Sequence, residues 1–381
     1  MSATARIDVR VEQTIMGALA RLGSADRDHL IAATGLSKGI VGDALGDLLE
    51  RNMVRPLGKS SNPRSAVVEI NPGAAHVVGV SVDDHDARAT IADLWGTPLA
   101  EKSIPLGAHR AADIAELCQL LVEAAGVSTV ECLVVGGAVG SQESSARAAA
   151  TGAQVVSIDL AVELHEHLGA SVHLEDEALL AVLGERWHGA ARGFDDVALL
   201  WVGRRVGLGQ LINGRPVRGA NGRAGDIGHL PLGPEPVGRG QRRGSFELVA
   251  TTSGMRLAMA AALERGGETT LTLASTARQI LDAADWGDRL ARRLVDIEAD
   301  LLAKAVLSVV CTSDPAMIIL GGEIGSHDAM LAPVQDACSR VLSYPARIER
   351  SQLGEHAVMV GAVAVAVERA RHTLLGASHL S

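Results

Sequence analysis

The stretch GRAGDIGHLPLGPEPVGRGQRRGSFELV, residues 222–249, gathers side chains that could hold a ligand. Asp226 and His229 stand three residues apart, and Glu247 follows a run of glycines and arginines. Such a composition is compatible with a metal loop, a phosphate-binding loop, or the wall of a pocket for an uncharged polar molecule. Carboxylates with one imidazole can accept several O–H hydrogen bonds, so the third kind of site would suit a molecule that carries hydroxyl groups.

Two of these three interpretations lack support elsewhere in the sequence. A structural zinc ion needs four ligands, and one histidine without neighbouring cysteines cannot hold it. The chain has 4 cysteines, Cys118, Cys132, Cys311 and Cys338, whose spacing is that of neither a zinc site nor a redox pair, so we interpret them as buried thiols. The stretch also does not follow a strand and open a helix, as a phosphate-binding loop does. The sequence therefore favours a pocket wall.

Length and composition indicate a globular protein of more than one domain. The chain has 381 residues, of which 47% are hydrophobic and 21% charged. No apolar run reaches the roughly 18 residues of a membrane span, and the first residues lack the apolar segment of a signal peptide. We therefore expect a cytoplasmic protein without a membrane partner. The net charge of -10 argues against a generally basic nucleic-acid binder.

The first 72 residues have the pattern of a winged helix-turn-helix. Apolar residues recur at helical spacing in residues 11–22, and Ser24 precedes a second short helix that Gly35 ends. Ser37 is a good N-cap for a third helix, and residues 54–72 have the pattern of two short strands around a turn. Three helices followed by a hairpin predict a DNA-binding domain over residues 1–72.

In this interpretation the third helix enters the major groove of DNA. The candidate DNA contacts are Ser37, Lys38, Gly39 and Gly42 on the helix, with Lys59 and Arg64 in the wing. The outward face of this helix offers few hydrogen-bond donors, and Asp43 would be repelled by phosphate. The alternative is a small helical module for dimerisation.

Residues 73–381 have the pattern of an α/β body. Alternating apolar strands, beginning with HVVGVSV, are interleaved with helices, which predicts buried sheets in two lobes. We place the second lobe at about residues 185–345.

At this point nearly the whole chain resembles a known family. The segments HLEDEALLAVLGERWHG, NGRPVRGANGRAGDIGHL and IILGGEIG are similar to those of the ROK family. The family contains sugar kinases and sugar-responsive repressors built on the actin-like ATPase fold. Its kinases lack a winged helix, so the resemblance implies a transcriptional regulator that acts on operator DNA as a homodimer or tetramer.

The resemblance also implies a set of sugar contacts. Carried over position by position, they are Asp176, His229 and Glu247, with Asp226 in place of a Glu and Glu175 in place of an Asn. A carboxylate at 175 beside three other acids would favour a cationic ligand such as an amino sugar. As alternatives, His229 could be a histidine of the core and Glu175 an exposed strand end.

The chain departs from the pattern of the family's kinases at both phosphate loops. Ser81, Asp83 and Asp84 stand where the kinases have an Asp and two glycines, so carboxylates would repel phosphate and a magnesium contact would be lost. Arg204 and Arg205 occupy the second loop. They could form ion pairs with Asp83 and Asp84 or remain solvated. We therefore expect no ATP binding and no kinase activity.

The family's zinc motif is also replaced. Gly238, Gly240 and Ser245 stand where its thiolates would be, which implies that the chain holds no zinc. We expect the arginines at 239, 242 and 243 to form a solvated turn, with contact to a sugar phosphate as the alternative.

Taken together, these features predict a sugar-responsive repressor without enzymatic activity, whose effector is a sugar or amino sugar, in free or phosphorylated form, bound between the two lobes. One alternative is a residual ROK sugar kinase with an appended DNA-binding domain, which Asp176 supports as a general base. Another is a module that binds DNA or protein without a ligand.

Overall fold

The chain folds into two compact units. The computed structural model describes residues 8–58, 66–83, 85–107, 109–137, 158–232 and 245–376. Within this part, the first unit takes in residues up to 135, 158–174 and 363–376, and the second takes in 136–137 and 175–362. The predicted second lobe lies inside the second unit. The predicted division at residue 72 stays a prediction, because both of its sides belong to the first unit. None of the described helices is both long and apolar enough to cross a membrane.

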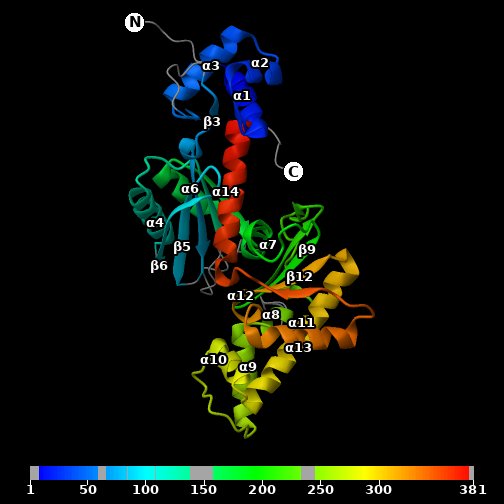
Figure 1. Cartoon of the computed structure of the whole chain (residues 1–381). Coiled ribbons are helices and arrows are strands. Elements are labelled where there is room, and N and C mark those ends of the chain that lie inside the picture. Colours follow the sequence, from blue (N-terminus) through cyan, green and yellow to red (C-terminus); the bar gives the residue numbers. More distant parts are fainter. Residues whose placement is uncertain are drawn as a thin grey trace. The chain divides into compact units, whose positions relative to one another are not determined.

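The amino-terminal segment is a winged helix-turn-helix (Figure 1). Its elements are α1 (Val9–Leu22), β1 (Ser24–Ala25), α2 (Arg27–Thr34), α3 (Lys38–Glu50), β2 (Val54–Pro56) and β3 (Val68–Ile70). The strands form an antiparallel sheet in the order β1-β3-β2. Fully buried apolar residues from all three helices, among them Ile15, Leu30 and Val41, form its core. The predicted architecture is confirmed.

The ends of these helices follow from their capping residues. Ser37 accepts a hydrogen bond from the amide of Ile40, as predicted for the N-cap of α3. The expected start of α2 was wrong, because Ser24 pairs with Glu69 in the sheet and Asp26 caps the helix. A strand of two residues is too short to show an alternating pattern in the sequence. Only its pairing with β3 identifies it as a strand.

The first unit contains a five-stranded sheet. Its strands are β4 (His76–Val82), β5 (Asp86–Asp93), β6 (Pro98–Pro105), β7 (Cys132–Gly137) and β8 (Ser171–Asp176), in the order β6-β5-β4-β7-β8. A short 3-10 helix, η2 (Pro72–Ala74), precedes β4, and α4 (Arg110–Ala125) and α6 (Ile158–Leu168) complete this region. Apolar residues of β4 and β5 pack with those of α4 in one buried cluster.

The second unit contains a sheet of the same design. Its strands are β9 (Val197–Val202), β10 (Val206–Ile212), β11 (Arg215–Pro216), β12 (Met317–Gly321) and β13 (Ile348–Arg350), in the order β11-β10-β9-β12-β13. Counted within each sheet, both have the strand order 3-2-1-4-5. The repeated sheet agrees with the predicted actin-like ATPase fold.

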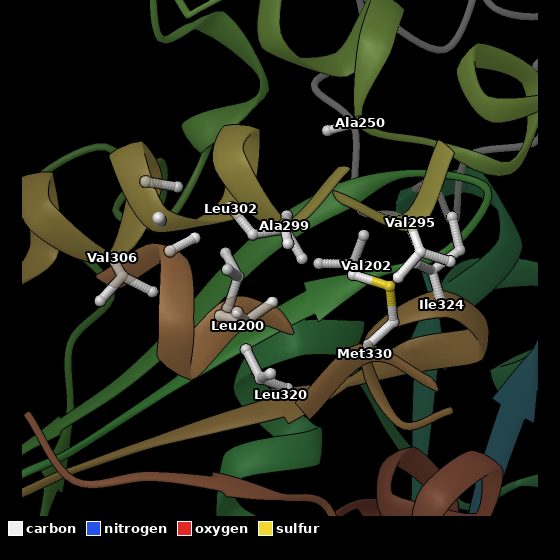
Figure 2. Close-up of a cluster of buried hydrophobic side chains, with 14 of the residues drawn as sticks. Leu200, Val202, Ala250, Val295, Ala299, Leu302, Val306, Leu320, Ile324 and Met330 are labelled. Atoms are coloured by element: carbon white, nitrogen blue, oxygen red, sulfur yellow. The ribbon is translucent and has the colours of Figure 1, made fainter. Parts of the chain in front are cut away.

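Helices pack on the second sheet around one buried apolar cluster. Its helical residues come from η3 (Ile227–His229), α8 (Ser245–Val249), α9 (Thr252–Glu264), α10 (Ala277–Asp285), α11 (Arg289–Ser313), α12 (Gly322–Gly325) and α13 (Asp328–Val341). The remaining helices are α7 (Glu177–His188), η4 (Gly354–His356) and α14 (Ala357–Leu375). Figure 2 shows Leu200 and Leu320 of the sheet facing Leu302 and Val306 of α11. This core includes Val206 of β10, Ile227 of η3 and Phe246 of α8, the elements that carry the candidate site described below.

Two glycines let α7 pack against its neighbours with little separation. A Cβ on Gly209 of β10 would overlap the carbonyl oxygen of Ala178, and its distance from the Ala178 carbonyl carbon would be 2.7 Å. A Cβ on Gly361 of α14 would similarly lie 2.6 Å from the carbonyl carbon of Leu180. Any side chain at these positions would separate the elements, so α7 is fixed between β10 and the first turns of α14.

A buried carboxylate ties the end of α7 to a distant loop. Glu185 has no exposed surface, and its carboxylate accepts hydrogen bonds from the hydroxyl of Ser351 and the amides of Ala190 (2.6 Å), Gln352 (3.4 Å) and Leu353 (3.0 Å). These bonds satisfy both carboxylate oxygens without a cation among the described partners.

Replacing Glu185 by glutamine should destabilise the fold. The side-chain amide nitrogen of glutamine cannot accept a hydrogen bond, so at least one buried donor loses its partner at a cost of about 1–3 kcal/mol. Urea unfolding should show this loss, whereas Glu177→Gln, a change of the same type at the other end of α7, should cost less. Equal stability of wild type and Glu185→Gln would contradict the role of the network.

Candidate functional site

The predicted sugar-contacting residues gather around the first residues of β10. Gly225 lies against β10, since the carbonyl of Leu208 occupies the place where its Cβ would stand. Its φ of 94° is one that glycine adopts readily. This contact fixes the start of the segment with Asp226 and His229. A Cβ on Gly207 of β10 would lie 3.1 Å from the Cβ of Ala178, two residues after Asp176, so β10 also lies close to the start of α7.

Asp226 and His229 lie at the two ends of η3 with their side chains accessible. Asp226 precedes this short helix, and His229 is its last residue. The distance from His229 Nε2 to Asp226 Oδ2 is 3.8 Å, and the side chains are 61% and 55% exposed. The imidazole is therefore not a histidine of the core, and both groups are free to meet a ligand.

Glu247 reaches the same place from α8. A Cβ on Gly228 would lie 3.2 Å from the Cβ of Glu247, 3.4 Å from its Oε2 and 3.5 Å from a methyl carbon of Val206. Gly228 therefore leaves room for the carboxylate to lie beside η3. Asp226, His229 and Glu247, which span more than twenty residues of sequence, form one cluster of accessible hydrogen-bonding groups.

Asp176 is held rigidly at the start of α7. It is the N-cap, and its Oδ1 accepts hydrogen bonds from the amides of Ala178 (2.9 Å) and Leu179 (3.4 Å). Burial raises the pKa of this carboxyl, and the two amides and the charge of Arg205 offset only part of that rise. That this carboxylate also accepts hydrogen bonds from sugar hydroxyls stays a prediction.

Glu175, the last residue but one of β8, has its charge balanced. Arg218 donates to its Oε2 through Nε (2.9 Å) and Nη2 (2.6 Å), and the glutamate side chain is only 13% exposed. The ion pair removes the physical basis for expecting a strongly negative pocket. Sequence reasoning missed Arg218, whose only signal was a basic residue beside the glycine-rich segment.

The arginines between β9 and β10 lie near acidic residues of their own unit. The charge of Arg205 acts to lower the pKa of Asp176. Burial raises the pKa of Glu323, and the charge of Arg204 opposes that rise. The charges of these two arginines thus act on the carboxylates of Asp176 and of Glu323 at the start of α12. That they replace the second phosphate loop of the kinases stays a prediction.

The first predicted phosphate loop is the turn between β4 and β5. Ser81 is half-buried on β4, and Oδ1 of Asp83 accepts hydrogen bonds from the amides of His85 (2.7 Å) and Asp86 (2.8 Å). One carboxylate oxygen of Asp83 is therefore used within its own turn. Asp84 lies outside the described residues, and pairing of either acid with Arg204 or Arg205 stays a prediction.

The predicted DNA-contacting residues of α3 are placed at its first turns. Lys38 and Gly39 are exposed, while Gly42 is half-buried beneath the guanidinium of Arg27 from α2. Lys59 and Arg64 of the wing lie outside the described residues.

The segment in place of the zinc motif is described only at its end. Positions 238–240 and the arginines at 242 and 243 lie outside the described residues, and the hydroxyl of buried Ser245 donates to the carbonyl of Leu230 (2.7 Å). That the chain holds no zinc stays a prediction. Across the described chain, no three His, Cys, Asp or Glu side chains are grouped as metal ligands would be.

Comparisons with known proteins cover both parts of the chain. Residues 77–369 match the ROK family. The DNA-binding transcriptional dual regulator NagC of Escherichia coli is 26% identical over 375 residues, which cover 93% of this chain and 89% of that protein. Glucokinase of Thermotoga maritima is 30% identical over 228 residues, which cover 56% of this chain and 71% of the kinase.

The fold has a solved counterpart along its full length. The structure of a ROK family transcriptional regulator, a homolog of the E. coli MLC protein, matches with a TM-score of 0.73 at 20% identity and covers 97% of this chain and 98% of that one. At this identity the match supports the fold.

Proposed function

Because the chain belongs to the ROK family, we propose that it is a transcriptional repressor that releases its operator DNA when a sugar binds. The observation that carries this proposal is the winged helix-turn-helix that precedes a ROK domain in one chain. The similarity to NagC extends over the winged helix as well as the ROK domain, whereas the glucokinase similarity covers about half of the chain.

The sugar site we propose consists of Asp176, Asp226, His229 and Glu247, with Glu175 held by Arg218. These groups supply carboxylate acceptors and one imidazole at fixed positions, which suits a ring of hydroxyls. Because Arg218 and Arg205 offset two of the acids, a neutral sugar suits the site better than a cationic amino sugar. Relatives named "N-acetylglucosamine repressor" make N-acetylglucosamine the first ligand to test.

Sugar and DNA would be coupled through the relative stability of two conformations. A ligand that binds one conformation better shifts the population toward it, and a coupling of about 1–3 kcal/mol changes DNA affinity by roughly 5- to 150-fold. Paired half-sites on an operator require at least two winged helices, so we propose a homodimer or tetramer.

The proposal is tested by fluorescence anisotropy on the DNA upstream of the chain's own gene. Measurements at low and moderate salt would be made without sugar and with glucose, N-acetylglucosamine, glucosamine and their 6-phosphates. Tight binding that one sugar class weakens at least fivefold is the expected result. Absence of binding at low salt would contradict DNA recognition, and binding that no sugar changes would contradict the sugar response.

We further propose that the chain does not phosphorylate its sugar or bind ATP. Support comes from Arg204 and Arg205 at the positions of the second phosphate loop and from Asp83, one of whose carboxylate oxygens is used in its own turn. Asp176 would then only bind hydroxyls. A coupled assay of ADP release over the same sugars should stay at the rate without protein, and turnover that Asp176→Asn abolishes would establish a residual kinase instead.

A further inference from the structure

The predicted recognition helix α3 is short of cationic side chains on its outward face. Lys38 is exposed in its first turn, but the face continues with Gly39, Gly42 and the exposed Asp43. DNA binding draws most of its affinity from contacts between Lys or Arg and phosphate. An additional cation from a neighbouring element would supply what this helix lacks.

Arg27, the first residue of α2, lies over this face. An ideal Cβ on Gly42 would overlap the Nη2 of Arg27 and would lie 2.7 Å from its Cζ and 3.2 Å from its Nε. The guanidinium therefore lies against the backbone of α3, in space that a side chain at position 42 would take. By contrast, a Cβ on Gly39 or Gly46 would have no atom within 4 Å.

The charge of Arg27 is not balanced within the described part of the chain. Two other arginines of this domain are paired: Arg51 forms ion pairs with Glu12 and Asp47, and Arg55 forms one with Glu69. Arg27 has no ion pair among the described residues, and its Nε is buried without a hydrogen-bond partner there. Nearby Asp26 is used as the cap of α2 and as the partner of His29.

We propose that Arg27 is a DNA-contacting residue whose guanidinium, positioned by Gly42, binds a backbone phosphate. In helix-turn-helix complexes the helix before the recognition helix crosses the DNA backbone, which places its first residues near phosphates. A guanidinium can donate two parallel hydrogen bonds to phosphate, and a preformed position lowers the entropy lost on binding. Gly42 thus acts as a positioning residue for Arg27. This inference rests on the proposed DNA-binding function.

The test measures DNA affinity against salt concentration for full-length variants, with the DNA upstream of the chain's own gene as the probe. Arg27→Gln should weaken binding about tenfold. The plot of the logarithm of the association constant against the logarithm of the salt concentration should become less steep by about 0.9, the value for one lost phosphate contact. Gly42→Ala should weaken binding in the same direction, because the methyl group displaces the guanidinium. Both variants should keep the wild-type melting temperature within a few degrees.

Two matched controls separate this role from general effects. Arg21→Gln removes the same charge from α1, and Gly46→Ala makes the same change in α3 where a Cβ meets nothing; neither should lower DNA affinity as much. Suppose that the wild type binds DNA but Arg27→Gln binds it with the same affinity as Arg21→Gln, or that Arg27→Gln lowers the melting temperature and leaves the salt dependence of binding unchanged. Either result would overturn the inference about Arg27 and leave the proposed DNA-binding function intact. If wild type does not bind this DNA even at low salt, the proposed function fails with it.

Discussion

Replacing Glu298 by methionine is expected to raise the free energy of unfolding by several kcal/mol at pH 8 and by much less at pH 5. Glu298 is 3% exposed in the middle of α11, and its Oε1 has no hydrogen-bond partner within the described chain. Burial raises the pKa of this carboxyl to about 8 from its ordinary value of 4.5. Between pH 4.5 and pH 8 the carboxyl is therefore protonated in the folded protein and ionised in the unfolded chain.

The sign of the pH dependence follows from that proton. Between pH 4.5 and 8 the native state binds more protons than the unfolded state, so stability falls as the pH rises, by up to about 1.4 kcal/mol for each pH unit. Below 4.5 the penalty is absent, and above 8 it is complete. Methionine has a similar length and no charge, so it removes the penalty.

Urea unfolding at pH 5, 6.5 and 8 checks this prediction. Asp296→Asn, which neutralises an exposed acid two residues earlier on α11, is the matched control and should not show a gain that grows with pH. A gain for Glu298→Met that is the same at all three values would show that the group is charged or hydrated in the folded protein.

Replacing Glu247 by alanine should produce a repressor that binds DNA normally but no longer responds to sugar. Its carboxylate lies beside Gly228 in the cluster with Asp226 and His229. Loss of hydrogen bonds to a charged acceptor costs about 1.5–3 kcal/mol, so sugar affinity should fall about 10- to 150-fold. The DNA affinity without sugar should stay within twofold of wild type.

Calorimetric titration with N-acetylglucosamine and the other sugars of the panel measures the loss. Glu264→Ala removes an exposed acid at the end of α9, outside the cluster, and should keep wild-type sugar affinity. Gly228→Val gives a second variant that disturbs Glu247 by its Cβ without removing the carboxylate, and it should also weaken sugar binding. Unchanged sugar affinity in both site variants would place the sugar elsewhere.

The sequence predicted those elements whose signals are local. Apolar spacing and capping residues such as Ser37 gave the helices of the winged domain, and alternation of apolar residues gave the strands of both sheets. The two-residue strand at Ser24 was missed because only its pairing with Glu69, far along the chain, makes it a strand. Asp226 and His229 were found as a pair because they are close in sequence.

Contacts between distant residues were beyond the reach of sequence patterns. The resemblance to the family suggested Glu175 and Glu247, but not that Arg218 would neutralise Glu175 across forty-three residues. In the same way, the glycines of α3 gave no sign that Arg27 would lie over Gly42. Such pairings depend on how elements far apart in the sequence pack together, which neither propensity nor hydrophobic period encodes.

The decisive test of the coupling between sugar and DNA is to measure the Kd of the responsive sugar twice, on free protein and on protein saturated with operator DNA. Thermodynamic linkage requires that each ligand change the affinity of the other by the same factor. We expect saturating DNA to raise the Kd of the sugar at least fivefold. This factor should equal the factor by which saturating sugar raises the Kd of the DNA. An equal sugar Kd in both states would contradict the proposed release mechanism, because the sugar could then not release the DNA.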